Sequence, residues 1–267
     1  MRVSEVLAER IRAGRPIALA TVIDGPGIGS HLLIDPDGEP LGTLGHPGLD
    51  RVVHRDGLAE LEAGRSGVRT YGPEGQTTPE DLLDTPGVKV FVESWSPPPE
   101  MWIFGAVDFT AALARVAKVL GYRVLVCDAR EIFATGRRFP MADEVRVTWP
   151  GPVFAERGAR LGARDAVCIL THDPKFDVPA IIGALATGAG YIGVMGSRQT
   201  HERRLERLAE AGVSSPADLE RLLSPIGLDL GARTPEETAI SICAEIIARR
   251  TGRTARPLRD GEGPIHP

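Results

Sequence analysis

The chain has 267 residues, of which 42% are hydrophobic and 25% charged, a composition typical of a globular protein with one large domain or two modest ones. Its formal charge of −5 argues against a nucleic-acid-binding or anionic-membrane surface, since both need a basic field. No apolar run approaches the roughly 18 residues of a membrane span, and residues 1–22 lack the uninterrupted apolar stretch of a signal peptide. We therefore expect a cytoplasmic protein.

The first 96 residues predict a small α+β domain, which ends near the stiff spacer of prolines 97–99. A turn at Pro36-Asp37-Gly38 lies between two apolar runs and indicates a hairpin. The other elements expected here are an amphipathic helix with Val3, Leu7 and Ile11 on one face, a strand over 17–22, a helix over 49–64 and a strand over 88–94.

Residues 97–248 alternate short apolar runs with helices, which is typical of a Rossmann-like, doubly wound parallel sheet. Four runs are apolar nearly throughout, as strands covered on both faces should be, whereas 144–148 alternates and is expected at the edge. The strand candidates are 101–105, 123–128, 144–148, 166–170 and 191–195.

The last helix of this domain has the clearest start signal in the chain. Thr234 supplies an N-cap hydroxyl, Pro235 follows at the first helical position, and Glu237 completes a capping box. We expect Ile240, Cys243 and Ile247 to form its buried stripe. The polar residues 249–267 predict a disordered tail.

Cys127, Cys168 and Cys243 lie far apart in the sequence, and each falls in an apolar run. This spacing gives neither a Cys-x-x-Cys motif nor a disulfide framework, so we expect three buried free thiols. No nucleophile–base pair and no cluster of metal ligands can be read from the sequence, and we assign neither catalytic nor metal-binding residues.

Ligands of an open parallel sheet bind beyond the carboxyl ends of its strands, and three of the predicted ends carry polar clusters. Asp128 and Arg130 follow Gly105 by 23 and 25 residues, near the spacing of the ribose-binding acid in nucleotide folds. The other two clusters are Thr171-His172-Asp173 after the fourth strand, and Gly196-Ser197-Arg198 with Thr200 after the fifth.

Each cluster also has a purely structural interpretation. A glycine turn with hydroxyls at a helix N-terminus makes an anion site, and Arg198 could clamp a phosphate through two hydrogen bonds. Equally, Ser197 or Thr200 could cap the helix, and Asp173 could be a turn residue. His172 could bond a backbone carbonyl, and Asp128 could cap the segment after its strand.

The first strand leads into Gly105-Ala106-Val107-Asp108, where a dinucleotide site has a second glycine at the third position. A Val107 side chain obstructs the approach of a pyrophosphate to the backbone. Asp108 suits the helix dipole but repels a phosphate. This turn argues against NAD(P).

Taken together, several motifs resemble the XdhC/CoxI family of molybdenum-cofactor maturation factors. They occur in order across residues 101–247: IFGA (103–106), CDAR (127–130), RFPMADEV (138–145), THDPKFDVPAI (171–181), YIGVMGSRQTHERRLERL (191–208) and PIGLDLGARTPEETAISICAEI (225–246). The first 96 residues are similar to the smaller domain of the family more loosely, through IALATV and the LLIDPDGEPLGTL hairpin.

The resemblance implies an accessory chaperone without turnover of its own that binds the molybdenum cofactor (molybdopterin) as cargo. It also implies sulfuration of this cargo by a cysteine desulfurase, insertion into an apo xanthine dehydrogenase or CO dehydrogenase-type molybdenum hydroxylase, and a homodimer. We expect the cargo phosphate at Gly196-Ser197-Arg198 and the pterin edge at Thr171-His172-Asp173. The full set of expected contact residues is Gly105, Ala106, Asp128, Arg130, Thr171, His172, Asp173, Gly196, Ser197, Arg198 and Thr200.

Two segments depart from the family pattern. Gly105-Ala106-Val107-Asp108 stands where members usually have Gly-Ala-Gly-His, and residues 45–50 lack the cysteine of a Ser-Gly-Gly-Cys-Val-Glu stretch. These departures leave a cofactor-free scaffold paralogue, docking to the hydroxylase maturation machinery, as one alternative function. The other alternative is an NAD(P)-binding oxidoreductase, suggested by the strand–glycine–helix unit and Asp128.

Overall fold

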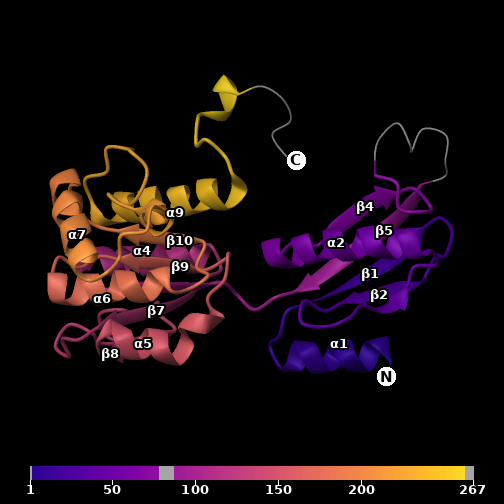
Figure 1. The fold of residues 1–267 in the computed structure, drawn as a ribbon, viewed down its shortest axis with the longest axis horizontal. Coiled ribbons are helices and arrows are strands. Elements are labelled where there is room, and N and C mark those ends of the chain that lie inside the picture. The colour runs from indigo at the N-terminus through magenta and orange to yellow at the C-terminus, as the bar shows by residue number, and fades with distance from the viewer. Residues whose placement is uncertain (1, 78–86, 262–267) are drawn as a thin grey trace. The chain divides into compact units, whose positions relative to one another are not determined.

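The computed structural model describes residues 2–77 and 87–261, and the chain divides into two compact units, Met1–Pro97 and Pro98–Pro267 (Figure 1). Each unit has a sheet of its own. The last six residues of the predicted tail, 262–267, lie outside the described residues. Within the described part of the chain, no helix is both long enough and apolar enough to cross a membrane.

The first unit is an antiparallel sheet of five strands in the order β3-β2-β1-β5-β4, with two described helices. The elements are α1 (Val3–Arg12), β1 (Ile17–Asp24), β2 (His31–Ile34), β3 (Leu41–Thr43), α2 (Pro47–Ala63), β4 (Gly67–Tyr71) and β5 (Val88–Trp95). The hairpin around Pro36-Asp37-Gly38 joins β2 to β3 as predicted.

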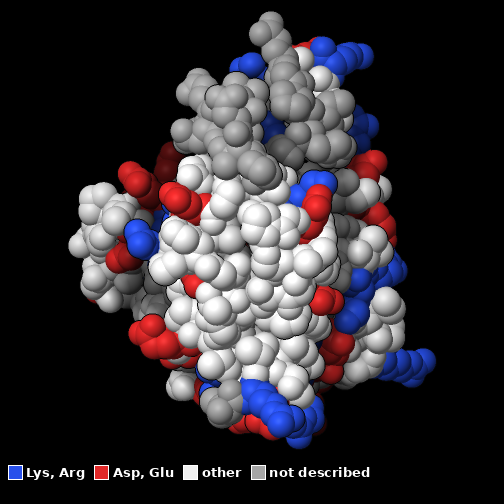
Figure 2. All heavy atoms as spheres, turned by 90° about the vertical axis from the view of Figure 1, so that its right-hand side faces the viewer, with Lys and Arg blue, Asp and Glu red and all other residues white. Residues whose placement is uncertain are grey.

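Alternation along the strands builds the core of this unit. Ala18, Ala20 and Val22 of β1 turn to one side, where they pack in one cluster with Leu49 and Val53 of α2. The sequence does not predict β4, because Gly67–Tyr71 has few apolar residues and only Tyr71 is buried. The face of the first unit that turns to the viewer in Figure 2 is largely uncharged at its centre.

The second unit contains a parallel sheet of six strands in the order β11-β10-β9-β6-β7-β8. Its strands are β6 (Glu100–Phe104), β7 (Arg123–Asp128), β8 (Glu144–Val147), β9 (Ala166–Ile169), β10 (Tyr191–Val194) and β11 (Leu222–Leu223). The chain starts at β6 in the middle, runs outward to β8, and returns to β9 on the other side. This is the doubly wound order that the sequence predicts, with β8 at the edge as expected.

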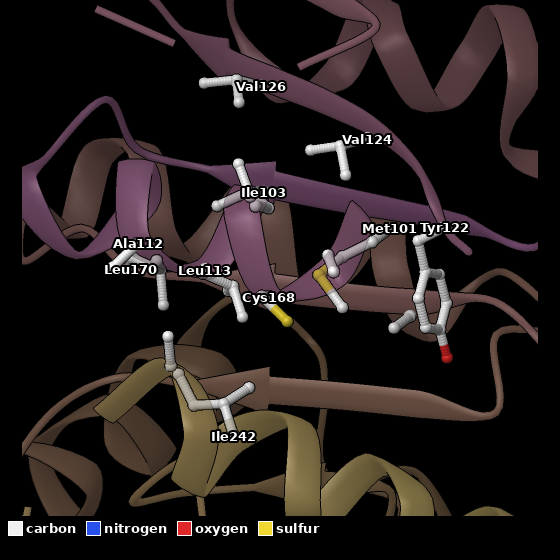
Figure 3. Packing of buried hydrophobic residues seen from close by; sticks show 14 of the residues in the cluster. Met101, Ile103, Ala112, Leu113, Tyr122, Val124, Val126, Cys168, Leu170 and Ile242 are labelled. Atoms are coloured by element: carbon white, nitrogen blue, oxygen red, sulfur yellow. The ribbon is translucent and has the colours of Figure 1, made fainter. Parts of the chain in front are cut away.

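Helices cover both faces of this sheet. They are α4 (Asp108–Val119), α5 (Pro150–Arg157), α6 (Pro174–Leu185), α7 (Arg198–Glu210), α8 (Pro216–Glu220) and α9 (Pro235–Thr251), with short 3-10 turns at Gly158–Arg160 and Leu258–Asp260. Met101 and Ile103 of β6 pack with α4 and α9 on one face (Figure 3). Trp102 and Phe104 pack with α5 and α6 on the other. Both faces of β6 are therefore buried.

The end of the chain corrects two sequence predictions. Ile240 and Ile247 of α9 are 53% and 39% exposed, and the buried stripe instead contains Ile242, Cys243 and Ile246. Isoleucines occur at several positions of this helix, so periodicity allows two neighbouring faces, and packing against α4 selects the one with Ile242. The helix also continues to Thr251, so residues 249–251 are helical and not disordered. Thr234 caps the helix as predicted, accepting a hydrogen bond from Glu237 N at 3.1 Å.

The position of the stripe gives a stability test. Replacing Ile242 with Ala should lower the free energy of unfolding by about 2–4 kcal/mol, because the side chain is 1% exposed and its loss leaves a cavity. Ile240→Ala on the same helix is the matched control and should change it by less than about 0.5 kcal/mol. Urea unfolding followed by circular dichroism measures both; equal losses would contradict this orientation of α9.

Candidate functional site

The candidate site lies where the strand order reverses, between the carboxyl ends of β6 and β9. Gly105 follows β6 with φ +116°, and a Cβ atom there would lie 2.4 Å from Thr171 Cγ2 and 3.1 Å from Thr171 N. Leu170 N donates to Phe104 O at 2.8 Å and Gly105 N donates to Cys127 O at 2.8 Å, so the three strand ends are joined. Glycine at 105 is therefore required by the close approach of Thr171.

Asp128 lies at the end of β7, is 2% exposed, and holds the turn that follows β6. Its Oδ2 accepts from Ala106 N at 2.7 Å, and its Oδ1 accepts from Arg130 N and Arg130 Nε at 2.9 Å each. Burial alone raises the pKa of Asp128, but hydrogen bonds from Arg130 and Ala106 outweigh burial and lower that pKa below its usual value. Both carboxylate oxygens therefore have protein partners already.

Arg138 contacts the turn after β6, and the sequence analysis did not select it as a site residue. Its Nη1 donates to Ala106 O at 3.2 Å and to Phe133 O at 3.3 Å, and its Nη2 pairs with Asp108 Oδ1 at 3.3 Å. The negative charge of Asp108, which argues against a phosphate, is thus countered by Arg138. The only signal for it in the sequence is its place at the start of the RFPMADEV motif.

The cluster after β9 is divided between the interior and the surface. Thr171 is buried, and its hydroxyl donates to Asp177 Oδ1. His172 and Asp173 are exposed, and Asp173 caps α6 by accepting from Lys175 N at 3.0 Å. Asp173 is thus a helix cap, where the sequence analysis offered a turn residue as its structural role. The hydrogen bonds that Arg130 donates to Asp128 raise the pKa of Arg130, and the charge of Asp173 raises it further, so these residues lie within electrostatic reach.

A buried ion pair connects this cluster to the end of β10. Arg204 Nη2 lies 3.7 Å from Asp177 Oδ2 and donates to Met195 O at 2.7 Å, while Arg204 Nη1 donates to Ser224 Oγ at 3.1 Å. Burial raises the pKa of Asp177 to about 6 and lowers the pKa of Arg204. Sequence reasoning missed both residues, because neither directly follows a strand.

The turn after β10 leads into α7. Ser197 caps the helix, accepting from Thr200 N at 3.1 Å, and the two hydroxyls share a hydrogen bond of 2.9 Å. Arg198 is the first helical residue and is exposed. Among the described residues its guanidinium has no hydrogen-bond or ion-pair partner, so it remains available to an anion.

The structure thus brings the expected residues to one edge but gives many of them protein partners. Gly105 contacts Thr171, and Gly196 lies beside Thr200. Ala106 N and the Arg130 guanidinium both donate hydrogen bonds to Asp128. His172 and Arg198 are the members that project freely at the surface. The carboxylate of Asp128 could contact a ribose only by giving up bonds to the turn.

Two hollows in the described surface lie elsewhere on the second unit. One of about 190 Å³ is at the amino ends of the strands, beside Tyr122 and Arg123, where β7 begins. The other, of about 360 Å³, lies between the end of α9 and residues 252–255. We place the candidate site at the carboxyl ends in spite of these hollows, because ligand groups of this fold bind there.

The three cysteines are buried, as predicted. Burial raises the pKa of the Cys127 and Cys243 thiols to about 12, and burial also raises the pKa of Cys168. Cys127 further donates to Thr148 O at 3.4 Å. In the described part of the chain no three side chains of His, Cys, Asp or Glu gather as metal ligands would.

Comparison with known families covers most of the chain. The XdhC Rossmann domain matches residues 101–246, and the XdhC and CoxI family matches residues 10–72. The match to the XdhC Rossmann domain therefore lies in the second unit, and the match to the XdhC and CoxI family lies in the first unit.

Three curated proteins are similar to this chain, and the chain spans less than half the length of each. A probable xanthine dehydrogenase subunit of Bacillus subtilis is 32% identical over 161 residues, 60% of this chain and 46% of that protein. The Uncharacterized protein YqeB of Escherichia coli is 27% identical over 87% of this chain and 43% of its own length. The Molybdenum cofactor insertion chaperone PaoD of Escherichia coli is 31% identical over 36% of this chain and 30% of its own length.

A solved structure from Bacillus halodurans, titled a xanthine dehydrogenase, is similar with a TM-score of 0.53 and 22% identity. It covers 96% of this chain and 97% of its own. At this identity the likeness shows the fold alone.

The contact between Gly105 and Thr171 predicts that Gly105→Ala lowers the free energy of unfolding by about 3 kcal/mol, from overpacking and backbone strain together. Gly121→Ala is the matched control: Gly121 also has a positive φ, of +81°, but nothing lies within 4 Å of its Cβ position. Gly121→Ala should lower the free energy of unfolding only by the backbone strain, about 1 kcal/mol. Guanidinium unfolding of the two variants measures this; equal costs would show that Thr171 does not restrict position 105.

The burial of the thiols predicts slow modification by a disulfide reagent at pH 8, since the thiolate is the reactive form. All three should react within seconds once the chain is unfolded in guanidinium. The absorbance of the released thiol chromophore gives the number of cysteines that have reacted. One thiol that reacts fast in the folded chain would contradict the burial described here.

Proposed function

The chain belongs to the XdhC and CoxI family, and from that premise we propose that it is a maturation factor that holds the molybdenum cofactor as cargo for insertion into a molybdenum hydroxylase. The names of two relatives support this class of role, because one is an insertion chaperone for this cofactor and another is a probable subunit of xanthine dehydrogenase. The fold supports it through the exposed side chains of His172 and Arg198 at the carboxyl ends of the strands, where the cargo could be bound and released.

Arg198, at the start of α7 and without a partner among the described residues, is the observation that carries the proposal. Molybdopterin has a phosphate, and a guanidinium can bind a phosphate through two parallel hydrogen bonds. The positive end of a helix dipole adds to this attraction, and α7 has 13 residues. Ser197 and Gly196 then shape the turn around the phosphate, while the Ser197 hydroxyl stays bonded to Thr200.

The pterin is proposed to lie over the turns after β6 and β9. A pterin edge has hydrogen-bond donors and acceptors, which the exposed His172 side chain can match. Asp128 stabilises the turn after β6 by accepting hydrogen bonds from Ala106 N and from Arg130. Thr171 contributes mainly its backbone and its contact with Gly105, because its hydroxyl is bonded to Asp177.

An NAD(P) oxidoreductase receives less support from the same geometry. The carboxylate expected to bind a ribose is occupied by Arg130 and Ala106. The strand order alone is shared by many unrelated functions. The cofactor-free scaffold is the remaining alternative, and the experiment below separates it from a cargo chaperone.

The proposal also covers partners. We propose an apo molybdenum hydroxylase as the client and a cysteine desulfurase as the source of sulfur, in the cytoplasm, with a homodimer as the assembly. Because Cys127, Cys168 and Cys243 are all buried, the desulfurase would transfer sulfur directly to the bound cargo, without a cysteine of this chain as a relay. The chain itself would then have no turnover of its own.

Retention of cargo tests the proposal. We expect the purified chain, incubated with molybdenum cofactor and freed of excess ligand, to retain pterin above a control protein. The oxidised fluorescent pterin measures retention. Arg198→Ala should weaken binding by about 1.5–3 kcal/mol, the scale of a charge-assisted hydrogen bond. Arg203→Ala, which removes another exposed arginine of α7, should leave it unchanged.

The alternatives give different results in the same experiment. No retention by the wild-type chain would contradict the chaperone role and favour the scaffold. Retention that Arg198→Ala does not weaken would remove Arg198 from the site but leave the cargo role. Tight binding of NAD(P) in calorimetry would instead favour the oxidoreductase.

A further inference from the structure

Buried charge in the described part of the second unit is concentrated at one edge. Its buried charged residues are Asp128, Asp177 and Arg204, and all three bond to groups at the carboxyl ends of strands. Asp128 braces the first turn. The Asp177–Arg204 pair has no role so far, although burying two charges is expensive in free energy.

The pair connects the turns that follow two neighbouring strands, β9 and β10, whose ends are joined by a hydrogen bond of 2.8 Å from Met195 N to Ile169 O. From the β9 side, the Thr171 hydroxyl donates to Asp177 Oδ1. From the β10 side, Arg204 Nη2 donates to Met195 O at 2.7 Å, one residue before Gly196. The Asp177–Arg204 contact of 3.7 Å closes the connection. The spacing between the Thr171 turn and the Gly196 turn is therefore fixed by side chains as well as by the sheet.

Stability does not account for this arrangement. The pKa of Asp177 is raised to about 6 by burial, above the value of about 4 for an exposed aspartate. The folded state therefore binds a proton at this residue more tightly than the unfolded state does. The stabilisation is fully present below about pH 4 and is lost as the pH rises through about 6. At neutral pH the buried, ionised Asp177 thus stabilises the fold less than its protonated form would, and stability alone does not explain why the pair is buried.

We propose that Asp177 and Arg204 are positioning residues of the cargo site, holding the Thr171 and Gly196 turns at the spacing that the cargo requires, so that protonation of Asp177 loosens the site. This inference rests on the proposed function. The charged groups that face Asp177 are Arg204 and Arg207 of α7, which favour its ionised form, and Asp173 at the start of α6, which opposes it. Protonation relieves the cost of burying the carboxylate in the fold as a whole, but it removes the attraction between Asp177 and Arg204. A shift toward acid would therefore loosen this one link and release cargo.

Cargo affinity across pH 5–8 tests the proposal, with the melting temperature measured on the same samples. Asp177→Asn should bind cargo about tenfold more weakly at pH 7.5, and wild type should lose about tenfold more affinity than this variant between pH 7.5 and 5. Thr171→Val keeps the shape of the side chain and removes its hydroxyl. It should weaken cargo binding in the same direction, and it serves if Asp177→Asn does not fold.

Asp165→Asn is the matched control at the opposite edge of the same sheet. Asp165 accepts from Glu100 N at 2.6 Å and Gly162 N at 2.7 Å, and burial raises its pKa as it does that of Asp177. Its variant should change the melting temperature and leave cargo affinity and its pH profile as in wild type. If it changes cargo affinity as much as Asp177→Asn does, loss of stability alone explains both, and the proposal is wrong.

A second measurement needs no cargo. Amide hydrogen exchange of residues 171–173 and 195–200 should be faster in Asp177→Asn than in wild type at pH 7.5, because the two turns are no longer held together. Unchanged exchange together with an unchanged cargo pH profile would overturn the positioning role alone. A wild-type chain that retains no cargo at any pH would overturn the proposed function, and the positioning role with it.

Discussion

The candidate site depends on the close approach of Gly105 to Thr171, at the point where the chain stops winding toward β8 and starts again at β9. A side chain at position 105 would push these two strand ends apart. Because they stay together, the turns after β6, β7 and β9 meet at one edge, where Asp128 can bond Ala106 N. The rest of the site is built on this contact.

Charge and apolar packing are separated in the second unit. Both faces of the sheet are filled by apolar side chains, with Met101 and Ile103 on one side and Trp102 and Phe104 on the other. Its fully buried charges gather instead at the carboxyl ends, in the residues described. A fold maintained for stability alone gains little from such charges, so the edge is where function is best sought. The XdhC Rossmann domain matches this unit apart from its two ends.

The sequence predicts the parts of the structure that follow from local patterns. The alternating pattern of residues 144–148 predicts an edge strand, and β8 is the last strand of the sheet. The three polar clusters all follow carboxyl ends of parallel strands, on the same side of the sheet. Long-range partners could not be predicted, because Asp177 and Arg204 are 27 positions apart and neither directly follows a strand. The exposed side of α9 was predicted wrongly for a related reason: isoleucines allow two faces, and only contact with α4 distinguishes them.

We propose that the carboxyl ends of these strands hold the molybdenum cofactor. A crystal structure of the chain with the cofactor bound tests it most directly. The cargo phosphate should lie within about 3 Å of the Arg198 guanidinium, with the pterin over the turns at Gly105 and His172. Cargo found at the hollow beside residues 252–255, or on the first unit, would contradict it.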